Sequence, residues 1–144
     1  MKIEQIYTNC LFQGSYIIES EGEIAVIDPL REPNIYIKKA EERNAKIKYI
    51  FETHIHADFV SGHLTLSKIT NAPIIFGPNA ELDYDCTIAR DLQEFKLGKI
   101  VLQVIHTPGH TLESSIILLK NEKNEKISIF TGDLSTELFK KQNT

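Results

Sequence analysis

The spacing of hydrophobic and polar residues predicts a chain made mainly of strands. Short apolar or alternating runs, bounded by turn residues, indicate these strands: 2–7, 10–19, 23–28, 47–53, 73–76, 95–97, 100–106, 114–119 and 127–131. The first three, joined by turns near 8–9 and 21–22, predict an antiparallel meander at the start of the chain.

One helix is predicted over residues 33–44. Pro33 suits the first turn of a helix, and Ile37 and Ala40 lie on one side of a segment that is otherwise rich in lysine and glutamate. This pattern is typical of a surface helix that packs one face on the protein.

A second helix is predicted to open at residues 61–62, with these candidate buried positions: Leu64, Leu66 and Ile69. Residues 79–92 have no clear period and are interpreted as a short helix or a loop. Because strands dominate and the helices lie outside them, the expected fold class is α/β (α+β) with a mixed sheet.

Composition and charge argue against several classes of protein. A chain of 144 residues, 42% hydrophobic and 25% charged, is ordinary for one globular domain. The net charge of −4 argues against binding nucleic acid or an anionic membrane, and no apolar run approaches the roughly 20 residues of a membrane span. The chain starts without a signal-peptide pattern, and Cys10 and Cys86 form no CxxC motif. We therefore expect a cytoplasmic protein with buried free thiols.

The five histidines of the chain fall within two short motifs. T-H-I-H-A-D-F-V-S-G-H, at 53–63, holds three of them, and H-T-P-G-H-T, at 106–111, holds two. A T-G-D motif follows at 131–133. Histidines scattered over surface and core would not cluster beside Asp58 in this way, so the pattern predicts a metal site.

The candidate metal ligands lie where predicted strands end. In extended chain, His54, His56 and Asp58 project to one side. His110 follows a Pro-Gly turn after one strand, and Asp133 follows the last strand. Three strand ends are thus expected to bring ligands to one rim of a sheet. Imidazole and carboxylate groups suit zinc, iron or manganese.

Other polar residues of these segments are given supporting roles. His63 is interpreted as a helix-start residue near the ligands or on the surface, and His106 as a hydrogen-bonding support at a strand end. Asp28 is predicted to be structural. Tyr84 and Asp85 fit a plain loop better than a pocket mouth.

Four ordered motifs, V-I-D-P, T-H-I-H-A-D, H-T-P-G-H-T and F-T-G-D, resemble those of the metallo-β-lactamase superfamily. The resemblance covers residues 1–133 and implies an αββα sandwich with the metal at the sheet edges. The single domain expected over residues 1–144 would be the N-terminal part of this fold, incomplete at the C-terminus, because members usually continue well beyond T-G-D. The apolar faces left exposed would favour association, so we expect a homo-oligomer.

Phe59 bears on the branch of the superfamily. Hydroxyacylglutathione hydrolases, the glyoxalase II type, have a histidine at this place in H-x-H-x-D-H, where it supplies a second metal, and phenylalanine cannot ligate. The longer string at 53–63, with H-T-P-G-H-T-L-E-S downstream, resembles persulfide dioxygenases, in particular members fused to rhodanese domains. That branch is therefore the leading interpretation.

This resemblance implies the roles of the site residues. The ligands of one Fe(II) per chain map onto His54, His110 and Asp133, which is the two-histidine, one-carboxylate arrangement of oxygen-activating iron. His56 and Asp58 become catalytic neighbours of the metal, and His56 stays a candidate ligand. The reactants implied are O2 and the persulfide of glutathione or another thiol, with sulfite and thiol as products. A rhodanese domain, fused or separate, is the implied partner.

Two alternatives stay open. A zinc-dependent hydroxyacylglutathione (thioester) hydrolase fits the superfamily and is opposed by Phe59. An inactive, truncated metal-binding remnant fits the short segment after Asp133. Metal analysis combined with oxygen uptake and S-lactoylglutathione turnover would separate these functions.

Overall fold

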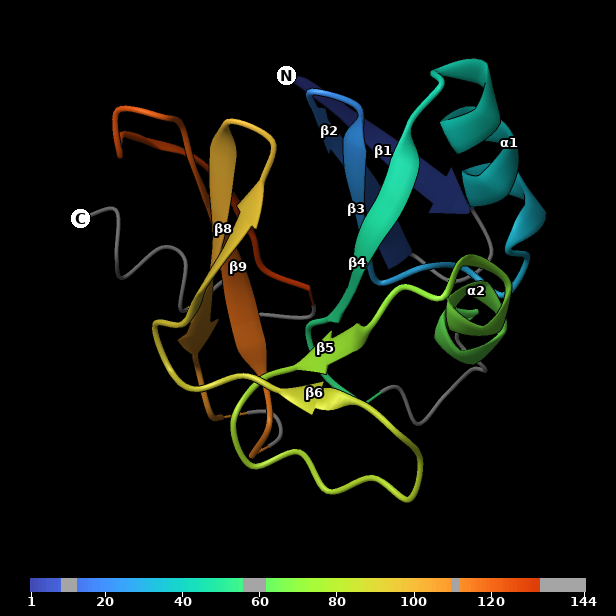
Figure 1. Cartoon of the computed structure of the whole chain (residues 1–144). Helices are drawn as coiled ribbons and strands as arrows, with labels where there is room; N and C mark the ends of the chain where they lie inside the picture. Colours follow the sequence, from blue (N-terminus) through green and yellow to red (C-terminus); the bar gives the residue numbers. More distant parts are fainter. Residues whose placement is uncertain (9–12, 56–61, 110–111, 133–144) are drawn as a thin grey trace.

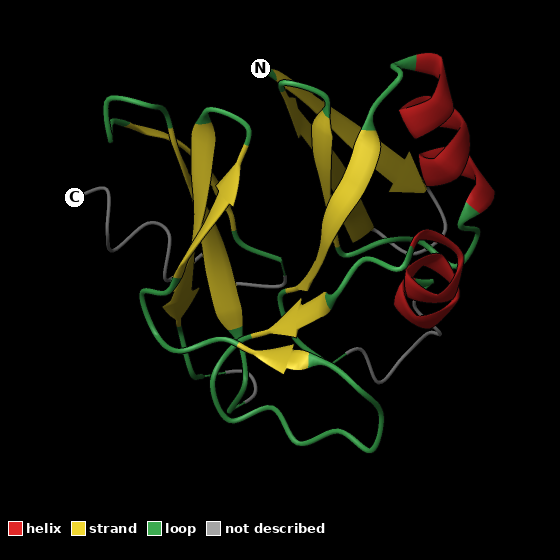
Figure 2. Cartoon of the chain, in the orientation of Figure 1, coloured by secondary structure: helices red, strands yellow, loops and turns green. Residues whose placement is uncertain are grey.

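The computed structural model describes residues 1–8, 13–55, 62–109 and 112–132. Within these ranges two β-sheets face each other, and two helices lie outside one of them (Figure 1). Figure 2 shows the same layers coloured by secondary structure, with both helices on one side of the paired sheets. Neither described helix is long and apolar enough to cross a membrane.

The larger sheet has six strands in the order β1-β2-β3-β4-β5-β6. Their bounds are β1 Lys2–Thr8, β2 Gln13–Ser20, β3 Glu23–Ile27, β4 Lys46–Glu52, β5 Ile74–Phe76 and β6 Thr87–Ile88. The first three strands pair antiparallel, which confirms the predicted meander. From β3 to β6 the pairs are parallel.

The helices form the crossovers that parallel strands require. Helix α1 (Asn34–Glu42) connects β3 to β4, and α2 (His63–Thr70) connects β4 to β5. Both cover the outer face of the six-stranded sheet, on the right of Figure 1. In the described part of the chain, the outer face of the other sheet carries no helix.

The smaller sheet is antiparallel, in the order β10-β9-β8-β7. Its bounds are β7 Glu94–Leu97, β8 Ile100–His106, β9 Ser115–Lys120 and β10 Lys126–Phe130. Its inward face is apolar: Leu102, Val104, Ile117 and Leu119 pack against the larger sheet.

Side chains of β3, in the middle of the larger sheet, are buried on both faces. Ala25 and Ile27 of β3 face the smaller sheet, whereas Ile24 and Val26 pack with the helices. Burial on both sides explains why β3 is a continuous apolar run. The mixed pairing and the outer helices confirm the expected α/β (α+β) class.

Two of the three predicted buried positions in the second helix were wrong, whereas Ala40 of the first helix is buried and Ile37 packs on the core as predicted. Leu66 is fully buried in α2, but Leu64 is 44% exposed and Ile69 is 56% exposed, because this short helix presents only a narrow face to the sheet. In α1 the large buried side chain is Tyr36, whose hydroxyl donates to Ser15 Oγ and accepts from the Leu30 N–H. Among residues 79–92 there is no helix, only a loop that contains β6.

Candidate metal centre

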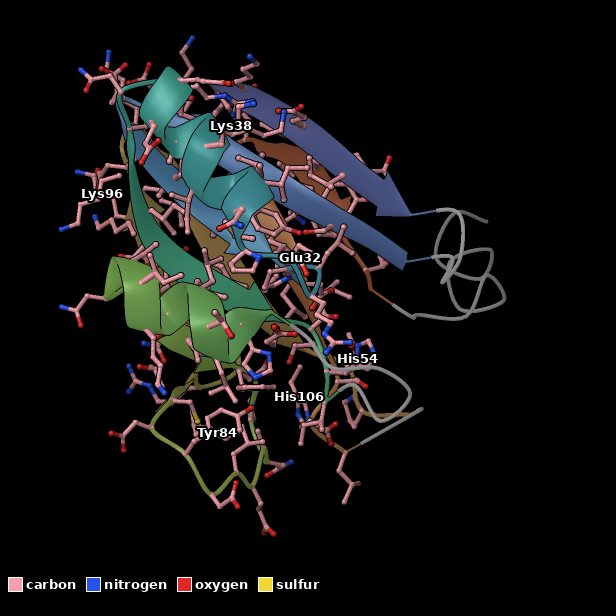
Figure 3. The ribbon with its side chains drawn as sticks, turned by 90° about the vertical axis from the view of Figure 1, so that its right-hand side faces the viewer. Glu32, Lys38, His54, Tyr84, Lys96 and His106 are labelled. Atoms are coloured by element: carbon pink, nitrogen blue, oxygen red, sulfur yellow. The ribbon has the colours of Figure 1, made fainter. Side chains whose placement is uncertain are left out.

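The candidate site lies at one end of the sheets, where β4 and β8 finish. His54 follows β4, and His106 is the last residue of β8. Figure 3 shows His54, His106 and Tyr84 toward the same end of the molecule, away from Lys38 and Lys96. Strand ends of two sheets therefore meet where the sequence predicts the metal.

Most of the candidate ligands lie outside the described residues. This holds for His56, Asp58, His110 and Asp133, whose roles as ligands or catalytic residues stay predictions. His54 is the candidate ligand that the structure describes. The residues described include no group of three or more His, Cys, Asp or Glu arranged to hold a metal ion.

The ring of His54 is buried and oriented by its neighbours. The residue is 6% exposed, and its Nδ1 lies 3.0 Å from Thr53 Oγ1. The single hydroxyl proton of Thr53 is donated to Asp28 Oδ2, at 2.7 Å, so Thr53 Oγ1 accepts from His54 Nδ1–H. The tautomer inferred from these bonds leaves the lone pair of the ring on Nε2, which fits a metal-binding imidazole.

Asp28 holds the turn before His54 with both carboxylate oxygens. Besides the hydroxyl bond, Oδ1 accepts from the Thr53 backbone N–H at 2.8 Å. Asp28 itself has φ 50°, in the left-handed region that Asp and Asn tolerate better than most residues. These bonds confirm the predicted structural role of Asp28 and extend it to the orientation of His54.

Thr53 is also the point where the other ligand-bearing segments come close. Its carbonyl accepts from the N–H of Ser115, at 2.8 Å, and Ser115 begins β9 after the 106–111 motif. Gly132, directly before Asp133, packs so closely that a Cβ there would clash with Thr53 Oγ1, and its φ of 58° favours glycine. Ser115, after the His110 segment, and Gly132, before Asp133, therefore both lie against Thr53, which directly precedes His54.

A second buried polar group lies beside the site. His63 Nδ1 is 3.2 Å from Glu52 Oε1, and His63 Nε2 is 2.9 Å from the Tyr84 hydroxyl. The imidazole also packs edge-on against Phe76, with ring centroids 6.1 Å apart. His63 thus occupies the start of α2 as predicted. It lies between Glu52, which directly precedes the first histidine motif, and Tyr84, which follows that motif in the chain.

Tyr84 is more than the plain loop residue that we predicted. Burial, together with the negative charge of Glu52, raises the pKa of its phenol to about 12. Asp85 is exposed, as a loop residue would be, and Cys86 is a half-buried free thiol whose pKa burial raises. Cys10 lies outside the described residues.

We expect Tyr84→Phe to lower the free energy of unfolding by about 1 kcal/mol, because the hydrogen bond to His63 is lost. The pKa of Tyr84 lies above the ordinary value of 10. The stability that the protonated phenol contributes to the folded state is therefore complete below pH 10 and is lost as the pH rises toward 12. Ultraviolet titration of the native protein should show a phenol with a pKa of about 12 that is absent from the variant. Identical titration curves for the two proteins would contradict the assignment.

His106 supports the turn that leads from β8 to β9. Its Nε2 lies 2.7 Å from the carbonyl oxygen of Leu112, and its N–H donates to Asp91 Oδ1 at 2.8 Å. This pairing agrees with the predicted role of His106 as a hydrogen-bonding support.

Sequence reasoning missed two carboxylates of this region. Glu52 ends β4 and is buried, and Glu113 is buried with Oε1 accepting from the Ile55 N–H at 3.1 Å. The available signal was a single acidic residue next to an apolar strand, since Glu52 ends I-K-Y-I-F-E and Glu113 precedes S-S-I-I-L-L.

Comparison with known proteins agrees with this architecture. A family model described as the metallo-beta-lactamase superfamily matches residues 8–84. The cytoplasmic hydroxyacylglutathione hydrolase of Arabidopsis thaliana is 33% identical over 123 residues, which are 83% of this chain and 47% of that protein. The chain spans about half the length of the curated relatives that it matches.

Two solved structures are similar over most of the chain. A metallo-beta-lactamase from Staphylococcus aureus subsp. aureus COL has a TM-score of 0.83 and 34% identity, covering 91% of this chain and 42% of the other. ETHE1 from Myxococcus xanthus has a TM-score of 0.75 and 28% identity, and the match covers 83% of this chain and 54% of ETHE1. The expected sandwich fold is thereby confirmed for the part of the fold that this chain contains.

Proposed function

Because this chain belongs to the metallo-beta-lactamase superfamily, we propose that it is an Fe(II)-dependent persulfide dioxygenase or the N-terminal part of one. The reaction proposed converts one glutathione persulfide, one O2 and one water into glutathione, sulfite and two protons. The terminal sulfur is oxidised, the S–S bond breaks, and the oxygen is reduced.

The observation that carries this proposal is Phe59. At the place where H-x-H-x-D-H motifs have a further histidine, this side chain has no donor atom, so the site is left with one metal ion. The structural similarity to ETHE1 gives some support to the persulfide dioxygenase branch.

The described geometry fits a bound metal at His54. Members of the superfamily bind metal ions, typically zinc or iron, and the tautomer of His54 presents Nε2 to such an ion. We propose His110 and Asp133 as the other ligands, with His56 and Asp58 holding water or a proton beside them. Bound Fe(II) would supply oxygen activation, and the protein would hold persulfide and O2 close together.

A zinc-dependent hydroxyacylglutathione hydrolase is the second candidate. The curated relatives favour it, since those compared are hydroxyacylglutathione hydrolases between 26% and 33% identical to this chain. In that case the metal would lower the pKa of a water molecule that attacks the thioester carbonyl.

The two functions differ in metal, co-substrate and product. We expect protein purified without added metal to contain about one iron per chain and to consume oxygen only when glutathione persulfide is added. Elemental analysis, an oxygen electrode and an assay of S-lactoylglutathione cleavage, run on one preparation, decide between them. Zinc with thioester cleavage and no oxygen uptake would favour the hydrolase, and a bound metal with neither activity would contradict both.

A cytoplasmic location, a homo-oligomer and a fused or separate rhodanese partner complete the proposal. The oligomer and the rhodanese partner rest on the sequence alone, and the location is also supported by curated relatives named as cytoplasmic. Size-exclusion chromatography with light scattering tests the oligomer directly.

A further inference from the structure

We propose that Glu113 is a positioning residue of the metal centre, and that its carboxylate fixes the backbone between His54 and His56. The proposal rests on the proposed metal site. Glu113 is 9% exposed, and its Oε1 accepts from the backbone N–H of Ile55 at 3.1 Å. The bond joins residues 58 positions apart in the sequence.

Glu113 lies between two segments that carry predicted ligands. It follows His110 by three residues, and Ile55 separates His54 from His56. A displacement of the Ile55 peptide is therefore expected to shift the two neighbouring histidines in the sequence. A carboxylate anchored in the His110 segment is placed to couple the positions of the two ligand loops.

A second hydrogen bond, from the main chain, runs parallel to this side-chain contact. The N–H of Ser115 donates to the carbonyl of Thr53 at 2.8 Å. Together the two hydrogen bonds join the backbone on both sides of His54, at residues 53 and 55, to the segment 113–115.

The chemistry of the acceptor also suits a cation site. An ionised carboxylate makes a stronger bond to a backbone N–H than a neutral acceptor does. Its negative charge, buried beside the ligand segments, also attracts a cation bound there, because charges interact more strongly away from water.

The partial exposure of Ile55 distinguishes a positioning role of Glu113 from a role in folding. Ile55 is 36% exposed, so we expect water to reach its N–H when the carboxylate is removed. The fold is then expected to survive, while the backbone between the two histidines loses its fixed position. Metal binding should respond more than stability does.

The test measures metal affinity and metal-free stability in the same variants. Zn(II) affinity is measured by chelator competition, and the absorption bands of bound Co(II) report the ligand geometry. We expect Glu113→Ala to weaken Zn(II) binding by roughly 10- to 100-fold, the range for groups that orient metal ligands. In Glu113→Gln the amide oxygen can still accept from Ile55, so most of the affinity should return. Glu122→Ala removes an exposed acidic residue and serves as the control for charge.

The outcomes are separable. Wild-type affinity and unchanged Co(II) bands in Glu113→Ala would overturn the inference. Equal loss in the Ala and Gln variants, accompanied by loss of metal-free stability, would also overturn it, because Glu113 would then be purely structural. A wild-type chain that binds neither ion would instead overturn the proposed function, and the inference with it.

Discussion

The His54→Ala variant is expected to lose its metal ion, with affinity falling by more than about 100-fold. Changes in the groups that merely orient metal ligands already cost 10- to 100-fold, so removal of a ligand should cost more. The measurement is metal content after dialysis, followed by chelator competition. The metal-free fold should persist, because the Asp28 bonds to Thr53 do not require the imidazole.

His106→Ala is the matched control for this variant. It removes a histidine too, this time from the second motif. The His106 side chain contacts the Leu112 carbonyl and is not a proposed metal ligand. We expect it to lower the free energy of unfolding by about 1 kcal/mol and to keep the metal. Equal metal content in His54→Ala and wild type would exclude His54 as a ligand.

The Asp28→Asn variant is expected to weaken metal binding by roughly 10- to 100-fold while the chain stays folded. An Asn oxygen can still accept from the Thr53 N–H, but the amide nitrogen donates to Thr53 Oγ1 instead of accepting from it. The Thr53 hydroxyl then donates to His54 Nδ1, which moves the ring proton to Nε2. The ligand nitrogen is thereby blocked without a change in shape.

Two measurements check this reversal. Long-range proton–nitrogen spectra of the metal-free protein report which nitrogen of His54 carries the proton, and chelator competition reports the metal affinity. Thr53→Ser keeps the hydroxyl and should behave as wild type in the spectra. A Nδ1-protonated His54 in Asp28→Asn, with unchanged affinity, would show that Asp28 does not control the ring.

Patterns that depend on neighbouring residues were predictable from the sequence. Short apolar or alternating runs located every described strand except β6, and proline with lysine-rich spacing located α1. The placement of Asp28 at a strand end beside Pro29 also indicated its structural role correctly. These features follow from local propensity and burial, which a single sequence records.

Contacts between distant segments were not predictable. Nothing near Glu113 indicates that its partner is Ile55, and the His63 contacts with Glu52 and Tyr84 arise only when three segments fold together. The exposure of Leu64 likewise depends on how much of α2 the sheet covers. Packing decided these points, and a hydrophobic pattern alone does not encode it.

We propose that His54, His110 and Asp133 share one metal ion. Anomalous diffraction from crystals of the metal-loaded protein, recorded at the iron and zinc absorption edges, tests it most directly. We predict one peak per chain, at roughly 2.1 Å from His54 Nε2 and in contact with the other two side chains. Two peaks, or one peak that these three side chains do not share, would contradict the claim.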